Sequence, residues 1–178
     1  FHRAYTGLLF KSETVMAPYC YRCPFNRARP ARADARHYRQ CSWQCVEQVE
    51  KVVGRARKQR RPFTTMVVEP LMQGAAGMIA QPRGWLSRVA ERVQGCGAQL
   101  IVEEVMTGFG RAGFPVESVS QGAIGKQVGP GLTPENGRLD SLDSGAVSLF
   151  ASQQESVRPD YLAVAKGLTG GYLPLAAT

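Results

Sequence analysis

Three short apolar runs, separated by a helical pattern and by an irregular stretch, constrain the fold of this chain most strongly. The runs TTMVVEP at 64–70, AQLIVEEV at 98–105 and YLAVA at 161–165 are rich in β-branched or aliphatic residues and predict buried strands. Between the first two runs, residues 83–97 carry apolar side chains at the spacing of one helical face, namely Leu86, Val89, Ala90 and Val93. Strands that alternate with helices predict an α/β fold, with a mostly parallel sheet covered by helices on both sides.

The organisation along the chain follows from the same pattern. Residues 63–114 and 150–178 form the expected core, and residues 1–62 form a mostly irregular lead-in with one helix. Residues 115–149 are rich in Gly, Ser and Pro without any sustained period, so we expect a disordered insertion or a gene-model artefact there. The chain opens at Phe1 without a Met and stops after an apolar run, and we expect it to be an internal fragment.

The positive charge of the chain is local. The net charge is +8, but residues 1–62 hold 14 Lys and Arg against 4 Asp and Glu. No stacking-aromatic or base-reading motif accompanies these charges, so we expect a solvated basic face and no nucleic-acid partner. No apolar run approaches the ~18 residues of a membrane span, which predicts that the chain does not cross a membrane.

The five cysteines are better explained as free thiols than as a disulfide scaffold. An odd and sparse set is typical of a reducing compartment, so we expect a cytoplasmic protein. Cys20-x-x-Cys23 and Cys41-x-x-x-Cys45 do resemble two halves of a tetrahedral zinc site. However, the second pair has three intervening residues, and Cys45 begins a predicted helix whose apolar positions are Val46, Val49, Val53 and Ala56. We expect no metal, with a zinc-stabilised basic nucleic-acid-binding module on residues 1–62 as the alternative.

The ends of the predicted strands are where ligands gather in parallel α/β sheets. Glu69 with Gln73 follows the first strand, Glu103 with Glu104 ends the second, and Lys166 comes directly after the third. A lysine at the end of a buried strand, beside the small-residue turn Gly-Leu-Thr-Gly-Gly, is expected to have little water around it. Such a lysine is suited to forming a Schiff base with an aldehyde cofactor, whereas the alternative is a lysine that simply reaches solvent.

The sequences of three segments resemble those of a known family. VVEPLMQGAAGM, LIVEEVMTGFGRAG and PDYLAVAKGLTGGYLPLAAT together resemble the class III, fold-type I, pyridoxal-phosphate aminotransferases. Within that class, QGAAGM and GGYLPLAAT are most similar to the biotin-pathway branch, the adenosylmethionine-8-amino-7-oxononanoate aminotransferases. The resemblance covers the chain except residues 115–149 and implies part of the large cofactor-binding domain.

The resemblance also implies roles for individual residues. Lys166 corresponds to the lysine that forms the Schiff base with pyridoxal 5'-phosphate and later moves a proton. Glu103 stands where the family has an aspartate that pairs with the pyridine nitrogen, and its extra methylene adds roughly 1.5 Å of reach. Glu69 and Gln73 match an EP-x-x-Q segment that lies beneath the cofactor in the family. The resemblance is equally compatible with a structural role and with a direct contact to the cofactor. A weakened or inactive site that only supports dimerisation is the alternative that Glu103 leaves open.

The function implied by the resemblance is amino transfer from adenosylmethionine to 8-amino-7-oxononanoate, in a homodimeric parent enzyme. The family's phosphate-binding loop, its ring-stacking aromatic residue and its small domain have no counterpart in this sequence, so the chain alone is expected to be inactive. Another class III aminotransferase that acts on an ω-amine is the nearest alternative.

Overall fold

The computed structural model describes residues 7–28, 39–112 and 148–178. The expectation for residues 115–149 therefore falls, except for its last two positions, outside the described residues.

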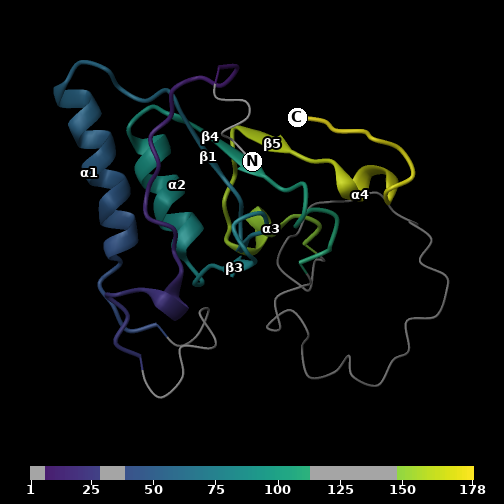
Figure 1. The fold of residues 1–178 in the computed structure, drawn as a ribbon, viewed down its shortest axis with the longest axis horizontal. Coiled ribbons are helices and arrows are strands. Elements are labelled where there is room, and N and C mark those ends of the chain that lie inside the picture. Colours follow the sequence, from purple (N-terminus) through teal and green to yellow (C-terminus); the bar gives the residue numbers. More distant parts are fainter. Residues whose placement is uncertain (1–6, 29–38, 113–147) are drawn as a thin grey trace, which may run out of the picture.

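A three-stranded parallel sheet forms the centre of the fold (Figure 1). Its strands are β1 (Thr65–Val68), β4 (Gln99–Glu103) and β5 (Tyr161–Ala163), in the order β1-β4-β5. In the register of this sheet, Val102 lies between Val68 of β1 and Leu162 of β5. The three predicted strands and their parallel arrangement are confirmed, and the carboxyl ends of all three strands lie at one edge of the sheet.

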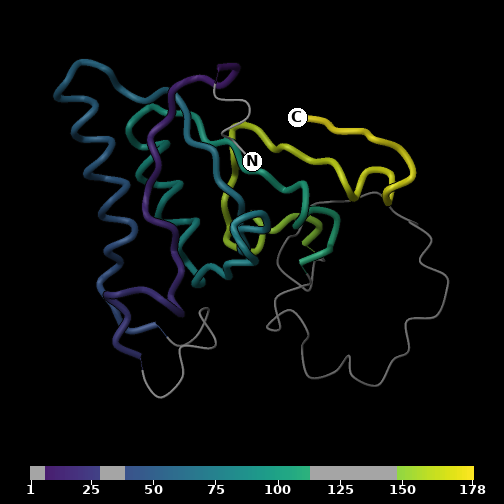
Figure 2. The backbone as a smooth tube through the Cα atoms, in the orientation of Figure 1, coloured from purple at the N-terminus to yellow at the C-terminus, as the bar shows by residue number. Residues whose placement is uncertain are grey.

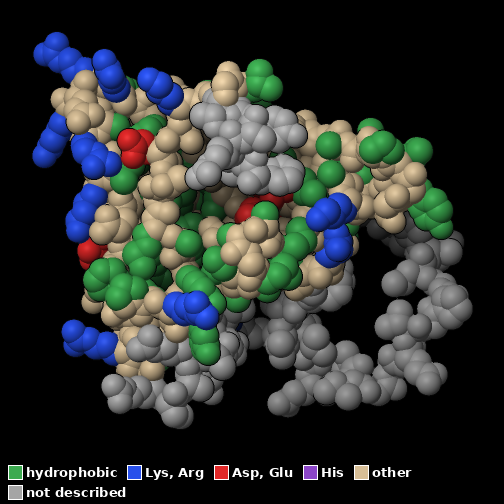
Figure 3. All heavy atoms as spheres, viewed as in Figure 1, with side chains coloured by type: hydrophobic (Ala, Val, Ile, Leu, Met, Phe, Trp, Pro, Cys, Tyr) green, Lys and Arg blue, Asp and Glu red, His purple; other side chains and the backbone are tan. Residues whose placement is uncertain are grey.

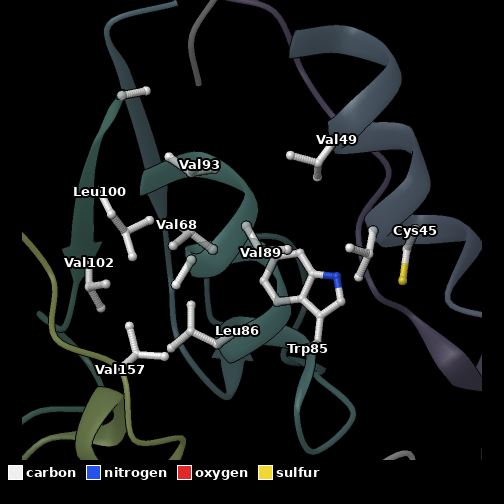
Figure 4. Packing of buried hydrophobic residues seen from close by; sticks show 13 residues of the cluster. Cys45, Val49, Val68, Trp85, Leu86, Val89, Val93, Leu100, Val102 and Val157 are labelled. Carbon is white, nitrogen blue, oxygen red and sulfur yellow. The ribbon is translucent and has the colours of Figure 1, made fainter. Parts of the chain in front are cut away.

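Two amphipathic helices cover one face of the sheet. Helix α2 (Trp85–Gly95) packs on β4, and α1 (Gln44–Lys58) packs on the outer side of α2 (Figure 1). Both helices were predicted from their apolar spacing. Their apolar faces and the inward residues of the strands form one buried cluster, shown in Figure 4, which includes Val49, Trp85, Leu86, Val89, Val93, Leu100 and Val102.

The second face of the sheet remains open among the described residues. Successive side chains of a strand point to opposite faces, so the neighbours of the buried Val68 and Val102 point away from α2. On that open face Val67 is 58% exposed and Tyr161 is 46% exposed. The expectation of helices on both sides is therefore met on one side only within this part of the chain.

Several short elements surround this core. A hairpin of β2 (Met72–Gln73) and β3 (Ile79–Ala80) encloses the glycine-rich loop, where the sequence analysis expected no strands. The other short elements are helices: the 3-10 turn η2 (Cys20–Arg22), α3 (Ala151–Gln154) and α4 (Lys166–Thr169).

Two segments that lack regular structure also have defined positions. Val15 and Met16 of the lead-in pack against the buried cluster. Figure 2 shows the lead-in, in purple, following an extended path beside the two helices. After α4 the chain turns back, and Ala177 exchanges two backbone hydrogen bonds of 2.9 Å with Val164. None of the helices in the described residues combines the length and the apolar character that crossing a bilayer requires.

Candidate active site

The carboxyl edge of the sheet gathers polar side chains from all three strands. Glu69 follows β1, Glu103 is the last residue of β4, and Lys166 begins α4 a few residues after β5. The register opposes Glu103 to Ala163, so the carboxylate and the lysine segment leave neighbouring strands at the same edge.

A cavity of about 300 Å³ lies at this edge beside β1. Three of the residues singled out from the sequence, Glu69, Gln73 and Glu103, line it. Its remaining wall comes from residues 15–18 of the lead-in, residues 66–68 of β1, and Trp85. The structure thus brings the three residues together, while Lys166 is not part of the cavity wall.

Glu103 sits in a mixed electrostatic environment. Its half-buried carboxylate accepts a hydrogen bond of 2.9 Å from the Val105 N–H. Burial raises the pKa of Glu103 above its ordinary value, and the Glu69 and Glu104 carboxylates raise it further. The Val105 N–H and the positive charge of Lys166 act in the opposite direction. Glu103 therefore lies within electrostatic reach of both Glu69 and Lys166.

Glu69 holds the loop that carries Gln73. One of its carboxylate oxygens accepts the Gly74 N–H at 2.7 Å, and its backbone carbonyl accepts a hydrogen bond of 2.5 Å from the Gln81 side chain. These contacts tie the start of the loop after β2, and the residue that follows β3, to the end of β1. Gln73 itself is half-buried and pairs with Ile79 in the hairpin.

Lys166 is exposed, in contrast to the expectation of little surrounding water. The reason is geometric: the chain leaves β5 before Lys166 and forms the one-turn helix α4, whose residues are exposed or half-buried.

The motif TGFGR contacts the lysine segment directly, a relationship that the sequence analysis missed. Phe109 has a positive φ of 60° and packs edge-on against Phe150, with ring centroids 5.4 Å apart. A β-carbon at Gly167 would come within 2.7 Å of three Phe109 carbons, so only glycine fits there without displacement. The sequence signal was the glycine that follows Lys166 directly, which was interpreted only as part of a flexible turn.

Glu104 is separated from its neighbour Glu103 by the alternation of the strand. Its side chain is fully buried, and its carboxylate accepts hydrogen bonds from Thr107, Ala151 and Ser152. The sequence places Glu103 and Glu104 together at the strand end. In the structure, Glu103 is half-buried at the cavity, whereas the Glu104 carboxylate is enclosed by protein.

The four cysteines with zinc-like spacing are neighbours. The Asn26 side chain joins their two loops, since it donates to the Cys20 carbonyl and accepts the Gln40 N–H, each at 3.0 Å. Burial, followed by the proximity of Cys41 and the other two thiols, raises the pKa of Cys20 to about 12. All the thiols are free, and among the described residues no group of three or more His, Cys, Asp or Glu side chains is arranged to hold a metal ion.

The basic residues of the lead-in form a separate surface. Lys and Arg side chains gather along the side of the molecule formed by α1 (Figure 3), and three of them, Arg55, Arg57 and Lys58, lie in its last turn. This surface lies on the opposite side of the core from the lysine segment (Figures 1 and 3).

Comparison with known proteins identifies the family. The model of the family "Aminotransferase class-III" matches residues 10–132. The chain belongs to the class-III aminotransferases. The resemblance found in the sequence is thereby confirmed.

Several curated relatives of this chain share one name. An adenosylmethionine-8-amino-7-oxononanoate aminotransferase from Nitratidesulfovibrio vulgaris is 37% identical over the whole of this chain. The proteins of the same name from Geobacter sulfurreducens and Methanocaldococcus jannaschii are 33% and 31% identical over the same extent. The chain spans 24%, 29% and 31% of the length of these three relatives.

Solved structures of aminotransferases also match this chain. A Bacillus anthracis aminotransferase matches 91% of this chain and 26% of its own, with a TM-score of 0.57 and 25% identity. An (S)-enantioselective omega-transaminase from Thermomicrobium roseum matches 75% of this chain and 21% of its own, with a TM-score of 0.50 and 28% identity. The expected fold class, an α/β portion of a fold-type I aminotransferase with a parallel sheet and flanking helices, is confirmed.

Proposed function

We propose that this chain is the part of a biotin-pathway aminotransferase that carries the reactive lysine, Lys166. In this proposal the enzyme transfers an amino group from adenosylmethionine to 8-amino-7-oxononanoate with pyridoxal 5'-phosphate as cofactor. The observation that carries the proposal is the placement of a carboxylate and an amine, Glu103 and Lys166, at the carboxyl ends of the neighbouring strands β4 and β5 of a class-III aminotransferase sheet. The identity of 37% with a relative of this name supports the choice of branch.

The residues at this edge fit the cofactor in chemical kind. The exposed Lys166 offers a primary amine for an aldehyde, and Glu103 offers a carboxylate for a pyridine nitrogen, and the two residues come at the carboxyl ends of neighbouring strands of the sheet. When bound, pyridoxal 5'-phosphate supplies a ring that accepts electron density from the substrate carbon being deprotonated. Glu103, Gln73 and Glu69 would be its neighbours on the side of the cavity.

Each residue then has a defined task. The Nζ atom of Lys166 would hold the cofactor through its aldehyde carbon and, once displaced by the substrate amine, would move a proton at the substrate carbon. Glu103 would keep the ring nitrogen protonated. Glu69 would act mainly by fixing the hairpin that carries Gln73, because its carboxylate already accepts the Gly74 N–H.

The assembly and location belong to the same proposal. We infer a homodimer, as the resemblance to the class-III aminotransferases implies. The free thiols support a reducing, cytoplasmic location.

A direct assay of the natural protein that contains this chain tests the proposal. After loading with pyridoxal 5'-phosphate, it is incubated with adenosylmethionine and 8-amino-7-oxononanoate, and the diamine product is measured by mass spectrometry. We expect the diamine to form, and to be lost in Lys166→Ala. The similarity to the omega-transaminase favours one second candidate, a class-III enzyme acting on ω-amines. Turnover with simple ω-amines and none with adenosylmethionine would select that candidate.

A further inference from the structure

The buried carboxylate of Glu104 has an unusually complete set of partners. It accepts the Ala151 N–H at 2.6 Å, the Ser152 N–H at 2.9 Å, the Ser152 hydroxyl at 2.7 Å and the Thr107 hydroxyl at 3.1 Å. The Glu104 residue as a whole is 0% exposed. Hydrogen bonds to an ionised acceptor are stronger than those between neutral groups, so these four donors define the orientation of the side chain.

The backbone of Glu104 is bonded to the two segments that define the lysine site. Its N–H donates to the Ala163 carbonyl at 2.7 Å, three residues before Lys166. Its carbonyl accepts the Gly108 N–H at 3.0 Å, in the turn whose next residue, Phe109, packs on Gly167. Glu104 therefore connects β4 with both the lysine strand and the turn that contacts the lysine helix.

The alternation of side chains along the chain links Glu104 to Glu103. Adjacent residues of an extended strand project to opposite sides, so a Glu104 fixed in the interior directs Glu103 toward the cavity edge. A buried carboxylate is costly unless it is fully hydrogen-bonded, and an apolar residue would satisfy packing alone at lower cost. A carboxylate at position 104 is therefore better explained by the direction that it gives to Glu103 than by a contribution to the stability of the fold.

We infer that Glu104 is a positioning residue: its carboxylate, held by Thr107, Ala151 and Ser152, fixes the residue whose backbone is bonded to Ala163 and Gly108, and so sets the placement of Glu103 and Lys166 relative to each other. This inference rests on the proposed function for its catalytic consequence. Its structural part, the coupling of Glu104 to the lysine segment, can be measured without cofactor.

The substitution Glu104→Gln tests the inference with little change of shape. The amide retains one acceptor oxygen, but its NH₂ group faces N–H and O–H donors that, in the wild type, donate hydrogen bonds to the second carboxylate oxygen. Glu155→Gln is the matched control, because Glu155 is also buried and accepts the Gly84 N–H at the start of α2, away from the lysine segment. Both variants are made in the natural protein that contains this chain, and we expect both to lower its melting temperature.

Two readouts separate positioning from stability. In cofactor-free protein, hydrogen–deuterium exchange of the peptide containing Lys166 should be at least tenfold faster in Glu104→Gln and unchanged in Glu155→Gln. With pyridoxal 5'-phosphate added, Glu104→Gln should bind it at least tenfold more weakly and shift the pH midpoint of the visible absorption band, while Glu155→Gln should do neither. Thr107→Val, which removes one of the four donors, should give a smaller change in the same direction.

The outcomes are distinguishable. If Glu104→Gln lowers only the melting temperature and leaves exchange, cofactor binding and the pH midpoint as in Glu155→Gln, the inference is overturned. If the wild-type protein binds no pyridoxal 5'-phosphate, the proposed function fails, and the exchange measurement alone then decides whether Glu104 holds the lysine segment.

Discussion

Gly167 lies so close to the ring of Phe109 that a β-carbon at position 167 would be within 2.7 Å of three Phe109 carbons. Real β-carbon contacts are not that short, so the two motifs TGFGR and AKG are complementary in shape as well as adjacent. The residue after Lys166 is a glycine because the turn bearing Phe109 occupies the space of a side chain.

This contact predicts the effect of Gly167→Ala. The methyl group must push Phe109 or α4 aside, and displacing a reacting group by about an ångström can cost on the order of 100-fold in rate. We therefore expect at least a tenfold loss of single-turnover rate in the natural protein. The second substitution Phe109→Ala should restore part of the rate in the Gly167→Ala background, because it removes the obstructing ring. Additive losses in the double variant would show that the contact is not the cause.

The length of the Glu103 side chain gives a second prediction. The resemblance implies an aspartate at this position in the family, and the added methylene of Glu103 is expected to misplace the carboxylate relative to the ring nitrogen. Glu103→Asp should raise the single-turnover rate at least tenfold, which corresponds to roughly 1.4 kcal/mol of barrier. Equal rates for Glu and Asp would show that the site accepts either length.

The raised pKa of Glu103 gives a third prediction, on the free energy of unfolding. Because the folded state binds this proton more tightly than the unfolded state, the favourable contribution is complete below the ordinary Glu pKa of about 4.3. It is lost as the pH rises through the folded-state pKa. Glu103→Gln keeps the acceptor for the Val105 N–H and removes the titration.

The measurement for this prediction is denaturant unfolding of the cofactor-free natural protein at pH 4 and pH 7. Glu103→Gln should be more stable than wild type at pH 7, and the difference should shrink toward pH 4. A difference that is constant with pH, or that grows toward pH 4, would contradict the assigned electrostatics.

The cysteine neighbourhood gives a fourth prediction, on thiol reactivity. With a pKa of about 12, roughly one Cys20 thiol in ten thousand is ionised at pH 8, and the side chain is also buried. Iodoacetamide should therefore alkylate the half-buried Cys41 and Cys96 at least tenfold faster than Cys20, as measured by peptide mass spectrometry over time. Rapid labelling of Cys20 in folded protein would contradict its burial among the other thiols.

The elements that the sequence predicted are those whose signal is local. β1, β4 and β5 are short apolar runs, and α1 and α2 have apolar residues at helical spacing, so periodicity alone identifies them. The parallel register then brings Glu69 and Glu103 to one edge without further information.

The features that the sequence did not predict depend on contacts between distant segments. The two-residue strands of the β2–β3 hairpin are too short for any period, and they are held by Glu69 and Gln81. The bonds from Glu104 to Ala151 and Ser152 cross a long stretch of chain. The exposure of Lys166 follows from what lies around α4, which no pattern within the lysine segment encodes.

The identity of the lysine that binds the cofactor tests the central claim most directly. The natural protein that contains this chain is loaded with pyridoxal 5'-phosphate, reduced with borohydride and digested, and the modified peptide is sequenced by mass spectrometry. The account predicts a single labelled site at Lys166, accompanied by a visible absorption band that is absent from Lys166→Ala. Labelling of a different lysine, or an unchanged band in Lys166→Ala, would contradict it.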